Sequence, residues 1–469
     1  MDREESDEEF DHFDWIENFA PCFATDGSNV HVLFDPNEFY QTLLALSSSS
    51  TRRVLLATLY CGTGQHEQEL FRTINVALRN APNLKCRVLL DCNRGTRGCP
   101  NSCDVLRPLV QKHGAGQRTR VHLFHSPKLR GFLKRILPER WNEVVGLQHM
   151  KLYIFDDTLV ISGANLSENY FTNRQDRYVI VRDCAALADF YESIIDAVAQ
   201  CSYELLSDGT LTLDPACRVH PTKDSESSYL RMLRDRLMSV MEAYHSRYKE
   251  SDQKGDTRIY PLVQYGAADV HYENRVITKL LGGQLPSTSL TLASGYFNLT
   301  NNYAQLLLDR SRQSPVTVVA AAPQANGFYG AHGVSGYIPA LYCHVASLFI
   351  NRAQKLGLWP EFVNVKEYAR PNWTFHAKGL WFNKTSSPEQ HTYATLAGST
   401  NYGYRSDHRD LEAQIVIVTK NIDLQKRLRE EQRHLLQYSN LLDGVVMQRA
   451  DHHIPFFVRI ISRFIRNFF

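Results

Sequence analysis

Two similar segments, far apart in the chain, constrain its fold more than any other feature. The first contains His149 and Lys151, separated by one residue, and the second contains His376 and Lys378 with the same spacing. An apolar run typical of a buried strand overlaps or follows each pair, and alternation along a strand sends both side chains to one face. The pattern predicts an internal duplication.

The residues that follow each pair strengthen this prediction. A turn of small residues ends in Asn165 in the first copy and in Asn401 in the second. Eleven positions further on, each copy has a carboxylate, Asp176 or Glu412, at the start of another apolar run. One His-x-Lys tripeptide occurs by chance in many chains of this length, whereas two copies with matching tails indicate a repeated functional unit.

An imidazole and an ammonium group on one face suit an anionic phosphate. The imidazole nitrogen can attack phosphorus while the ammonium group neutralises charge on the equatorial oxygens. Each half therefore contributes one His, one Lys, one Asn and one carboxylate to a predicted phosphoryl-group centre.

Strands and helices alternate from Thr51 onward, in the same order in both halves. Together with the duplication, this alternation predicts an α/β fold of two tandem domains, each with a mixed, largely parallel sheet flanked by helices. The duplication also predicts that the active site lies between the domains, on a pseudo-twofold axis. Ligands on such sheets bind at the carboxyl ends of strands. The predicted strands include 54–60, 87–91, 121–124, 290–295, 316–321 and 362–365. The predicted segments are an acidic, disordered N-terminus (1–14), a first domain (15–218), a helical connector (219–257), a second domain (258–450) and a C-terminal amphipathic helix (451–469).

Composition excludes several classes of partner and site. With 52 basic and 50 acidic residues the net charge is +2, so nothing demands a nucleic acid or another polyanion. The ten cysteines are scattered, and the cluster of Cys92, Cys99 and Cys103 lacks a metal-site spacing, which favours free thiols in a reducing compartment. No metal or cofactor is predicted. No apolar run reaches the roughly twenty residues needed to span a bilayer, and the longest candidate is 337–350.

Two stretches combine basic and large apolar residues. One is 128–137, and the other is 456–469, in which Arg459, Arg463 and Arg466 recur at helical intervals. A helix of this kind can lie in the lipid interface and bind anionic headgroups, and the alternative is a helix docked on its own domain. The predicted membrane residues are Phe457, Arg459, Arg463, Phe464 and Phe468.

Arginines near the predicted site could bind a second phosphate. Arg94 and Arg97 follow a predicted strand in a Gly-rich loop, where a solvated turn is an equally good interpretation. The full predicted set is Arg94, Arg97, Arg174, Arg177, Arg405 and Arg409.

The paired motifs identify the chain as similar to the phospholipase D superfamily. Longer segments resemble the eukaryotic mitochondrial phosphatidylglycerophosphate synthase family, and the match runs from about Phe13 to Phe469. One departure is Asn383, where the second motif has an Asp; the first motif keeps Asp156. The other is that no presequence is visible. The segments that carry the resemblance are 147–151, 162–167, 170–178, 295–300, 373–381 and 403–412.

The resemblance implies transfer of a phosphatidyl group from CDP-diacylglycerol to glycerol 3-phosphate, on the matrix side of the mitochondrial inner membrane. In this mechanism His149 attacks phosphorus, and His376 transfers the proton of the acceptor hydroxyl. Asp176 and Glu412 orient the imidazoles. The remaining predicted catalytic residues are Lys151, Lys378, Asn165 and Asn401, which contact the phosphate, and Asp156.

Three alternatives stay open. A phosphatidylserine synthase of the same superfamily would share the donor, and a hydrolytic phospholipase or nuclease would use water as the acceptor. A non-catalytic lipid-binding protein is disfavoured because both His and Lys pairs are intact. The sequence leaves the oligomeric state and the residues that contact cytidine undetermined.

Overall fold

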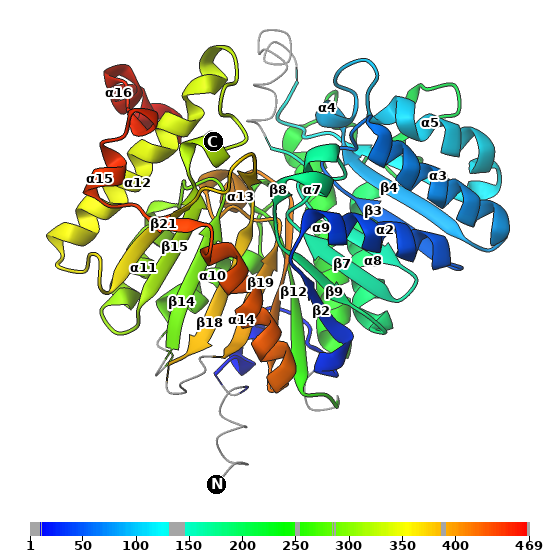
Figure 1. Ribbon diagram of the computed structural model, residues 1–469. Coiled ribbons are helices and arrows are strands. Elements are labelled where there is room, and N and C mark those ends of the chain that lie inside the picture. The colour runs from blue at the N-terminus through cyan, green and yellow to red at the C-terminus, as the bar shows by residue number, and fades with distance from the viewer. Residues whose placement is uncertain are drawn as a thin grey trace.

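The computed structural model describes residues 10, 12–130, 146–248, 254–283, 285, 288–385 and 391–466. Within these residues the chain forms a nine-stranded sheet from the first half and a ten-stranded sheet that comes mainly from the second. Figure 1 shows the two halves side by side, the first at the right and the second at the left.

Eight consecutive strands have the same order in the two sheets, and the strand at one outer edge of each sheet has no counterpart in the other. The first runs β11 (Leu211–Leu213), β10 (Tyr203–Leu205), β5 (Thr119–Phe124), β4 (Lys85–Asp91), β3 (Arg53–Ala57), β6 (Leu152–Phe155), β7 (Thr158–Ser162), β9 (Tyr178–Val181) and β2 (Val30–Leu33). The second runs β21 (Ser439–Leu441), β16 (Val363–Tyr368), β15 (Val316–Ala321), β14 (Thr288–Ser294), β18 (Lys378–Lys384), β19 (Thr392–Gly398), β20 (Glu412–Thr419), β12 (Thr257–Tyr265) and β1 (Phe23–Thr25), with β13 (Val270–His271) beside β12. This equivalence supports the predicted duplication.

Parallel pairing is less extensive than predicted. Only β3, β4 and β5 in the first sheet, and β14, β15 and β16 in the second, pair in parallel within the described residues. The remaining pairs of both sheets are antiparallel. The cause is local, because β6 and β7 are joined by only two residues, which permits a hairpin and not a crossover.

Helices cover both sheets and fill the space between them. Three helices of the first half pack on its outer face: α2 (Pro36–Ser49), α3 (Gln65–Asn80) and α5 (Ser102–His113). The shared core between the halves contains α8 (Ala185–Ala199), α9 (Glu226–Arg247) and α14 (Ile422–Leu436). The outer face of the second half carries α10 (Tyr272–Gly282), α11 (Asn301–Ser311) and α12 (Ile338–Lys355). The shorter helices are α4 (Cys92–Gly95), α7 (Glu168–Thr172), α13 (Tyr404–His408) and α15 (Gly444–Met447).

The described part of the N-terminal segment corrects two predictions. Phe10 and Phe13 are buried, and the Phe13 ring contacts Phe382 at a centroid distance of 6.0 Å, so this part of the acidic segment is ordered. β1 pairs with β12 in the second sheet, although it falls within the predicted first domain, 15–218. Apolar side chains among the acidic residues account for both differences, because burying them stabilises a packed arrangement.

The C-terminal segment forms α16 (Phe456–Ile465), as its spacing predicts. Residues 131–145, Phe468 and the side chains of Arg463 and Phe464 lie outside what the structure describes. A single described stretch, 333–355, is long and apolar enough to cross a membrane. It contains α12, whose Val345, Phe349 and Ile350 pack into the core of the second half, as expected for a core helix.

Candidate active site

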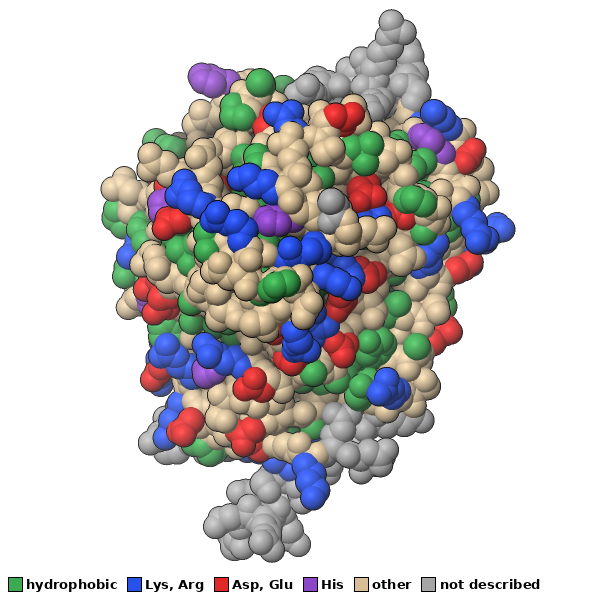
Figure 2. Space-filling model, turned by 90° about the vertical axis from the view of Figure 1, so that its right-hand side faces the viewer, with side chains coloured by type: hydrophobic (Ala, Val, Ile, Leu, Met, Phe, Trp, Pro, Cys, Tyr) green, Lys and Arg blue, Asp and Glu red, His purple; other side chains and the backbone are tan. Residues whose placement is uncertain are grey.

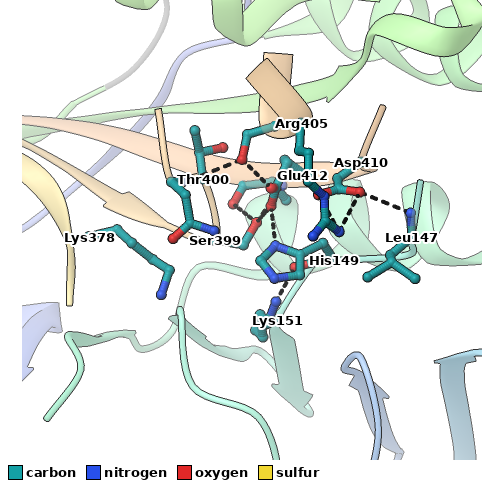
Figure 3. Close-up of polar contacts among 12 residues, drawn as sticks. Leu147, His149, Lys151, Lys378, Ser399, Thr400, Arg405, Asp410 and Glu412 are labelled. Carbon is teal, nitrogen blue, oxygen red and sulfur yellow. Dashed lines mark hydrogen bonds and ion pairs between the residues drawn. The ribbon is translucent and has the colours of Figure 1, made fainter. Parts of the chain in front are cut away.

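Each histidine is oriented by a carboxylate from the opposite half. Nδ1 of His149 lies 2.9 Å from a carboxylate oxygen of Glu412, and Nδ1 of His376 lies 2.6 Å from Asp176. Figure 3 shows the first of these pairs, with Lys151 beside it. The predicted orienting residues are therefore brought to the histidines, and the pairing crosses between the two copies.

Backbone pairing across the two halves produces this crossing. The amide of His149 donates to the carbonyl oxygen of Leu411 at 2.8 Å, and Leu411 directly precedes Glu412. The amide of His376 donates to Gln175 at 2.8 Å, directly before Asp176, where β8 (Arg174–Gln175) pairs with β17 (Thr374–Phe375). Each imidazole thus lies beside the carboxylate of the other copy, because backbone pairing holds the two segments in register.

A small residue is required at the meeting point of the halves. A Cβ atom on Gly163 would lie 2.6 Å from an oxygen of Asp176 and 2.9 Å from the Lys378 side chain. Glycine in this turn therefore allows the Asp176 carboxylate and the Lys378 ammonium group to approach each other.

The carboxylates fix the tautomer of both rings. A carboxylate accepts hydrogen bonds, so Nδ1 of each neutral imidazole carries the proton and Nε2 carries the lone pair. Nε2 of His149 makes no hydrogen bond to any described side chain. Nε2 of His376 lies 3.3 Å from the hydroxyl of Tyr170, and Nζ of Lys378 lies beside the same ring, 2.6 Å from Nδ1 and 3.1 Å from Nε2. Both rings are thus in the form that can act as nucleophile or base.

Glu412 is held in place by two serine hydroxyls. Ser406 donates to one carboxylate oxygen at 2.8 Å, and Ser399 donates to the oxygen that faces His149. Burial opposes ionisation of Glu412, but its contacts with His149, Lys151 and Ser399 keep its pKa below the usual value. Glu412 is therefore a carboxylate at neutral pH.

Burial keeps both imidazoles neutral. It lowers the pKa of His149 against the opposing effect of Glu412. The pKa of His376 lies well below its usual value because burial and the Lys378 ammonium group both disfavour its charged form. Burial also raises the pKa of Asp176 to about 6, against the effect of Lys378.

Two buried lysines supply positive charge beside the histidines. Nζ of Lys151 donates to the carbonyl oxygen of His149 at 2.6 Å, and Nζ of Lys378 donates to the carbonyl oxygen of His376. Burial lowers the pKa of Lys151 to about 7 and that of Lys378 to about 8. Because removal from water disfavours the ammonium form, an anion bound between the lysines would stabilise their charges.

Both histidines line one cavity of about 410 Å³, a size that suits a small ligand or headgroup. Asn165 and Asn401 also line it, and Oδ1 of Asn401 has no hydrogen-bond partner among the described residues. The predicted arginines that line it are Arg94, Arg97, Arg174 and Arg405.

Three predicted site residues lie elsewhere. Asp156 follows β6 at the end of the strand away from Lys151, and its carboxylate accepts hydrogen bonds from the backbone amides of residues 51–53. Arg177 is buried in an ion pair with Glu431 at 2.7 Å, with its guanidinium group over the Trp381 ring. Arg409 lies against the ring of Tyr404 and is not among the described residues that line the cavity. The first two stabilise the fold, and none of the three is placed to contact a substrate.

Two described clusters have the donor atoms that a metal ion uses, and both lie outside the cavity. One contains Cys343, Glu367 and His452, and the other contains His122, Glu204 and Asp214. In the second, Arg120 already pairs with both carboxylates. The cavity itself presents cationic and amide groups, which suit a phosphate anion.

Comparison with known proteins gives a consistent result. No family model matches the chain. The chain is 39% identical to the mouse protein named CDP-diacylglycerol--glycerol-3-phosphate 3-phosphatidyltransferase, mitochondrial, over 97% of this chain and 86% of that protein. Identity to the human protein of the same name is also 39%, with the same coverage. A protein of Saccharomyces pastorianus with this activity in its name is 32% identical over 90% of the chain.

The chain belongs to the CDP-diacylglycerol–glycerol-3-phosphate 3-phosphatidyltransferase family. Among solved structures, phosphatidylserine synthase of Haemophilus influenzae Rd KW20 superposes with a TM-score of 0.71. The match covers 98% of this chain and 97% of that chain at 19% identity, and it confirms the predicted fold.

Several residues around this phosphatidyltransferase site were not predicted. Tyr170 contacts the His376 ring, Tyr296 lines the same cavity, and Ser399 and Ser406 hold Glu412. Asp410 accepts from the amide of Leu147 at 3.0 Å and pairs with Arg405. All five lie within segments that carry the family resemblance or beside the small-residue turns. Their proximity to these motifs is the sequence feature that could have identified them.

Proposed function

We propose that this chain transfers the phosphatidyl group of CDP-diacylglycerol to glycerol 3-phosphate through a phosphohistidine on His149. The observation that carries the mechanism is the pair of neutral imidazoles, oriented by Glu412 and Asp176, on one arginine-lined cavity. The choice of donor and acceptor rests on the names of the relatives.

In the first step, Nε2 of His149 attacks the phosphorus that carries the diacylglycerol. The bond from this phosphorus to the bridging oxygen of the pyrophosphate breaks, and CMP leaves with the electron pair. CMP is a stable anion, so this step needs little acid assistance. Glu412 stabilises the positive charge that develops on the His149 ring, as the carboxylate of a catalytic triad does.

In the second step, a hydroxyl oxygen of glycerol 3-phosphate attacks the same phosphorus. The bond between phosphorus and Nε2 of His149 breaks, and the hydroxyl proton passes to Nε2 of His376. The Nδ1 proton of His376 faces Asp176, which leaves Nε2 available as the base. The hydroxyl of Tyr170 and Nζ of Lys378 lie 3.3 Å and 3.1 Å from this nitrogen, and the acceptor hydroxyl replaces the Tyr170 contact during the reaction.

Charge in both transition states is balanced by the protein's own groups. Lys151 and Lys378 lie beside the two imidazoles and neutralise the equatorial oxygens, and Asn165 and Asn401 donate hydrogen bonds to them. Arg94, Arg97, Arg174 and Arg405 line the rest of the cavity and bind the phosphates of CMP and of the acceptor. An acceptor with its own phosphate fits this cationic set better than serine or water does.

The protein acts at a mitochondrial membrane, on the matrix side of the inner membrane, and contacts the lipid through α16. The names of the mouse and human relatives support the organelle. Phe456 and Ile460 of α16 are 77% and 50% exposed, and Phe457 is partly exposed, as expected for a helix that enters the lipid interface. Proteolysis of mitoplasts with and without detergent tests the side, and the matrix assignment fails if intact mitoplasts expose the protein.

An acceptor competition tests the proposed reaction. The purified protein is given CDP-diacylglycerol labelled in the phosphatidyl phosphate, with glycerol 3-phosphate, serine or no acceptor in parallel. We expect labelled phosphatidylglycerophosphate and CMP with glycerol 3-phosphate alone. Phosphatidylserine as the main product, or phosphatidic acid at the same rate without acceptor, would overturn the assignment.

A further inference from the structure

Two equivalent connections, one from each half, line the cavity with side chains of different chemistry. Arg94 and Arg97 line it from the connection between β4 and β5, in the first half. The equivalent connection of the second half, between β15 and β16, lines it with apolar side chains. These are Phe328, Ala331, Val334, Ile338 and Tyr342.

This division matters because the two connections follow equivalent strands. The common strand order makes β4 the counterpart of β15 and β5 the counterpart of β16. Two copies of one structural unit therefore present a basic wall and an apolar wall to the same phosphate. A phosphatidyl donor has the same asymmetry, with a charged nucleotide on one side of phosphorus and two acyl chains on the other.

The apolar wall continues onto the outside of the molecule. Val334 lines the cavity and is 58% exposed, so it lies at the mouth. The Tyr337 ring meets the Phe457 ring edge to face at a centroid distance of 4.9 Å, which joins the wall to α16. The end of α16 is also tied to the cavity, because the Asn298 side chain, which lines it, donates to the carbonyl oxygen of Arg466 at 2.5 Å.

Exposed apolar side chains are concentrated on this part of the described structure. Half of the large ones lie on residues 329–337 and 456–461, and only Val76 and Leu206 lie in the first half. On the outer face of the first half, shown in Figure 2, Lys and Arg are interspersed with Asp and Glu. Figure 1 shows α4 and α16 on opposite sides of the same end of the molecule. A contiguous apolar surface of this kind marks a site of contact with lipid or another apolar partner.

We infer that residues 326–342 form a lipid port, an apolar path between the bilayer at α16 and the cavity. The acyl chains of the donor lie along this path while its phosphate is held between the histidines. The inference rests on the proposed function, and it fixes the orientation of the donor. Its diacylglycerol lies against the wall of the second half, and its nucleotide points toward Arg94 and Arg97. CMP therefore leaves through the basic side, and glycerol 3-phosphate enters by the same side while the phosphatidyl group stays on the enzyme.

Comparison of a long-chain and a short-chain donor tests the port in the full-length protein. Val334→Glu adds a carboxylate at an exposed position of the mouth, and Val76→Glu makes the same change on α3 in the first half as the control. We expect Val334→Glu to lower kcat/KM for dioleoyl CDP-diacylglycerol in vesicles by about tenfold or more, because a charge at an apolar contact is costly. Transfer from a water-soluble dibutyryl donor should fall far less, by about threefold at most, and Val76→Glu should alter neither rate.

The outcomes separate the port from the reaction itself. Equal loss with both donors, or no loss with either, would overturn the port. Absence of transfer by the unmodified protein from both donors would instead refute the proposed function. A CDP-diacylglycerol with a diazirine at the acyl terminus gives a second readout that does not need turnover. Peptides from 326–345 and 456–466 should be labelled, and labelling centred on residues 92–98 would contradict the orientation.

Discussion

Removing the charge of Glu412 and of Asp176 should impair different chemical steps. Glu412→Gln and Asp176→Asn keep the size of each side chain and remove the carboxylate that accepts a hydrogen bond from Nδ1 of a histidine. The crossed pairing means that the change in the second half acts on His149, and the change in the first half acts on His376. Glu412→Gln should slow phosphohistidine formation, and Asp176→Asn should slow transfer to glycerol 3-phosphate.

The magnitude follows from the hydrogen bonds around Glu412. Ser399 and Ser406 both donate to its carboxylate, and His149 supplies the third hydrogen bond. A glutamine amide group turned toward Nδ1 would donate, which stabilises the tautomer with a proton on Nε2 and removes the nucleophilic lone pair. The equivalent change in a serine protease triad costs about 10⁴-fold, so we expect a loss of about 10³- to 10⁴-fold, or about 4–5.5 kcal/mol.

Rapid-quench measurement with donor labelled in the phosphatidyl phosphorus separates the steps. Base-stable, acid-labile protein label reports the first step, and its decay on addition of glycerol 3-phosphate reports the second. Thermal unfolding of both variants controls for misfolding. Accumulation of label in Glu412→Gln together with its absence in Asp176→Asn would refute the crossed assignment.

Three further predictions concern pH, the membrane and the corrected residues. The rate of adduct formation should fall as pH drops through the pKa of His149, which lies below 6.5, because the imidazole becomes protonated. The rate should also decline as pH rises past about 7 to 8, where Lys151 and Lys378 lose their protons. An adduct rate that stays constant up to pH 9.5 would contradict this prediction. Phe456→Ser with Ile460→Ser should reduce flotation with anionic liposomes and leave activity on detergent-dispersed donor unchanged. Val445, 73% exposed on α15, provides the control, and Val445→Ser should change neither flotation nor activity; unchanged flotation of the α16 variant would refute the role of α16. Arg177→Met should destabilise the protein by about 3–5 kcal/mol, because it leaves Glu431 buried without its ion-pair partner. Asp156→Asn should destabilise it by about 1 kcal/mol. The kcat of the folded protein should be unchanged in both variants, and a selective loss of kcat would show that the residue acts in catalysis.

The sequence predicted the parts of the fold that depend on local pattern. Spacing along the chain identified the duplication, α3, the connector helix α9 and α16, because an apolar face with helical period must pack. It did not predict that β1 joins the second sheet, since a three-residue strand acquires its partner only through tertiary packing. The extent of parallel pairing was overestimated because hairpins and crossovers have similar apolar strands.

The candidate site was predicted in its residue types and not in its pairing. Both histidines, both carboxylates and both asparagines lie at or beside one cavity, as the repeated motif indicates. Which carboxylate faces which histidine depends on register between the halves, through His149 with Leu411 and His376 with Gln175, and no spacing within one copy contains that information. Arg177 and Asp156 were misassigned because charged residues beside a catalytic motif can equally be structural.

The most direct test of the mechanism is to locate the covalent phosphatidyl group. His376→Ala is incubated with labelled CDP-diacylglycerol without acceptor, quenched at high pH, digested and analysed by mass spectrometry. The mechanism predicts a phosphatidyl adduct on His149 that forms readily and transfers to glycerol 3-phosphate very slowly, and no adduct in His149→Ala. An adduct on His376 that persists in His149→Ala and disappears in His376→Ala would contradict it.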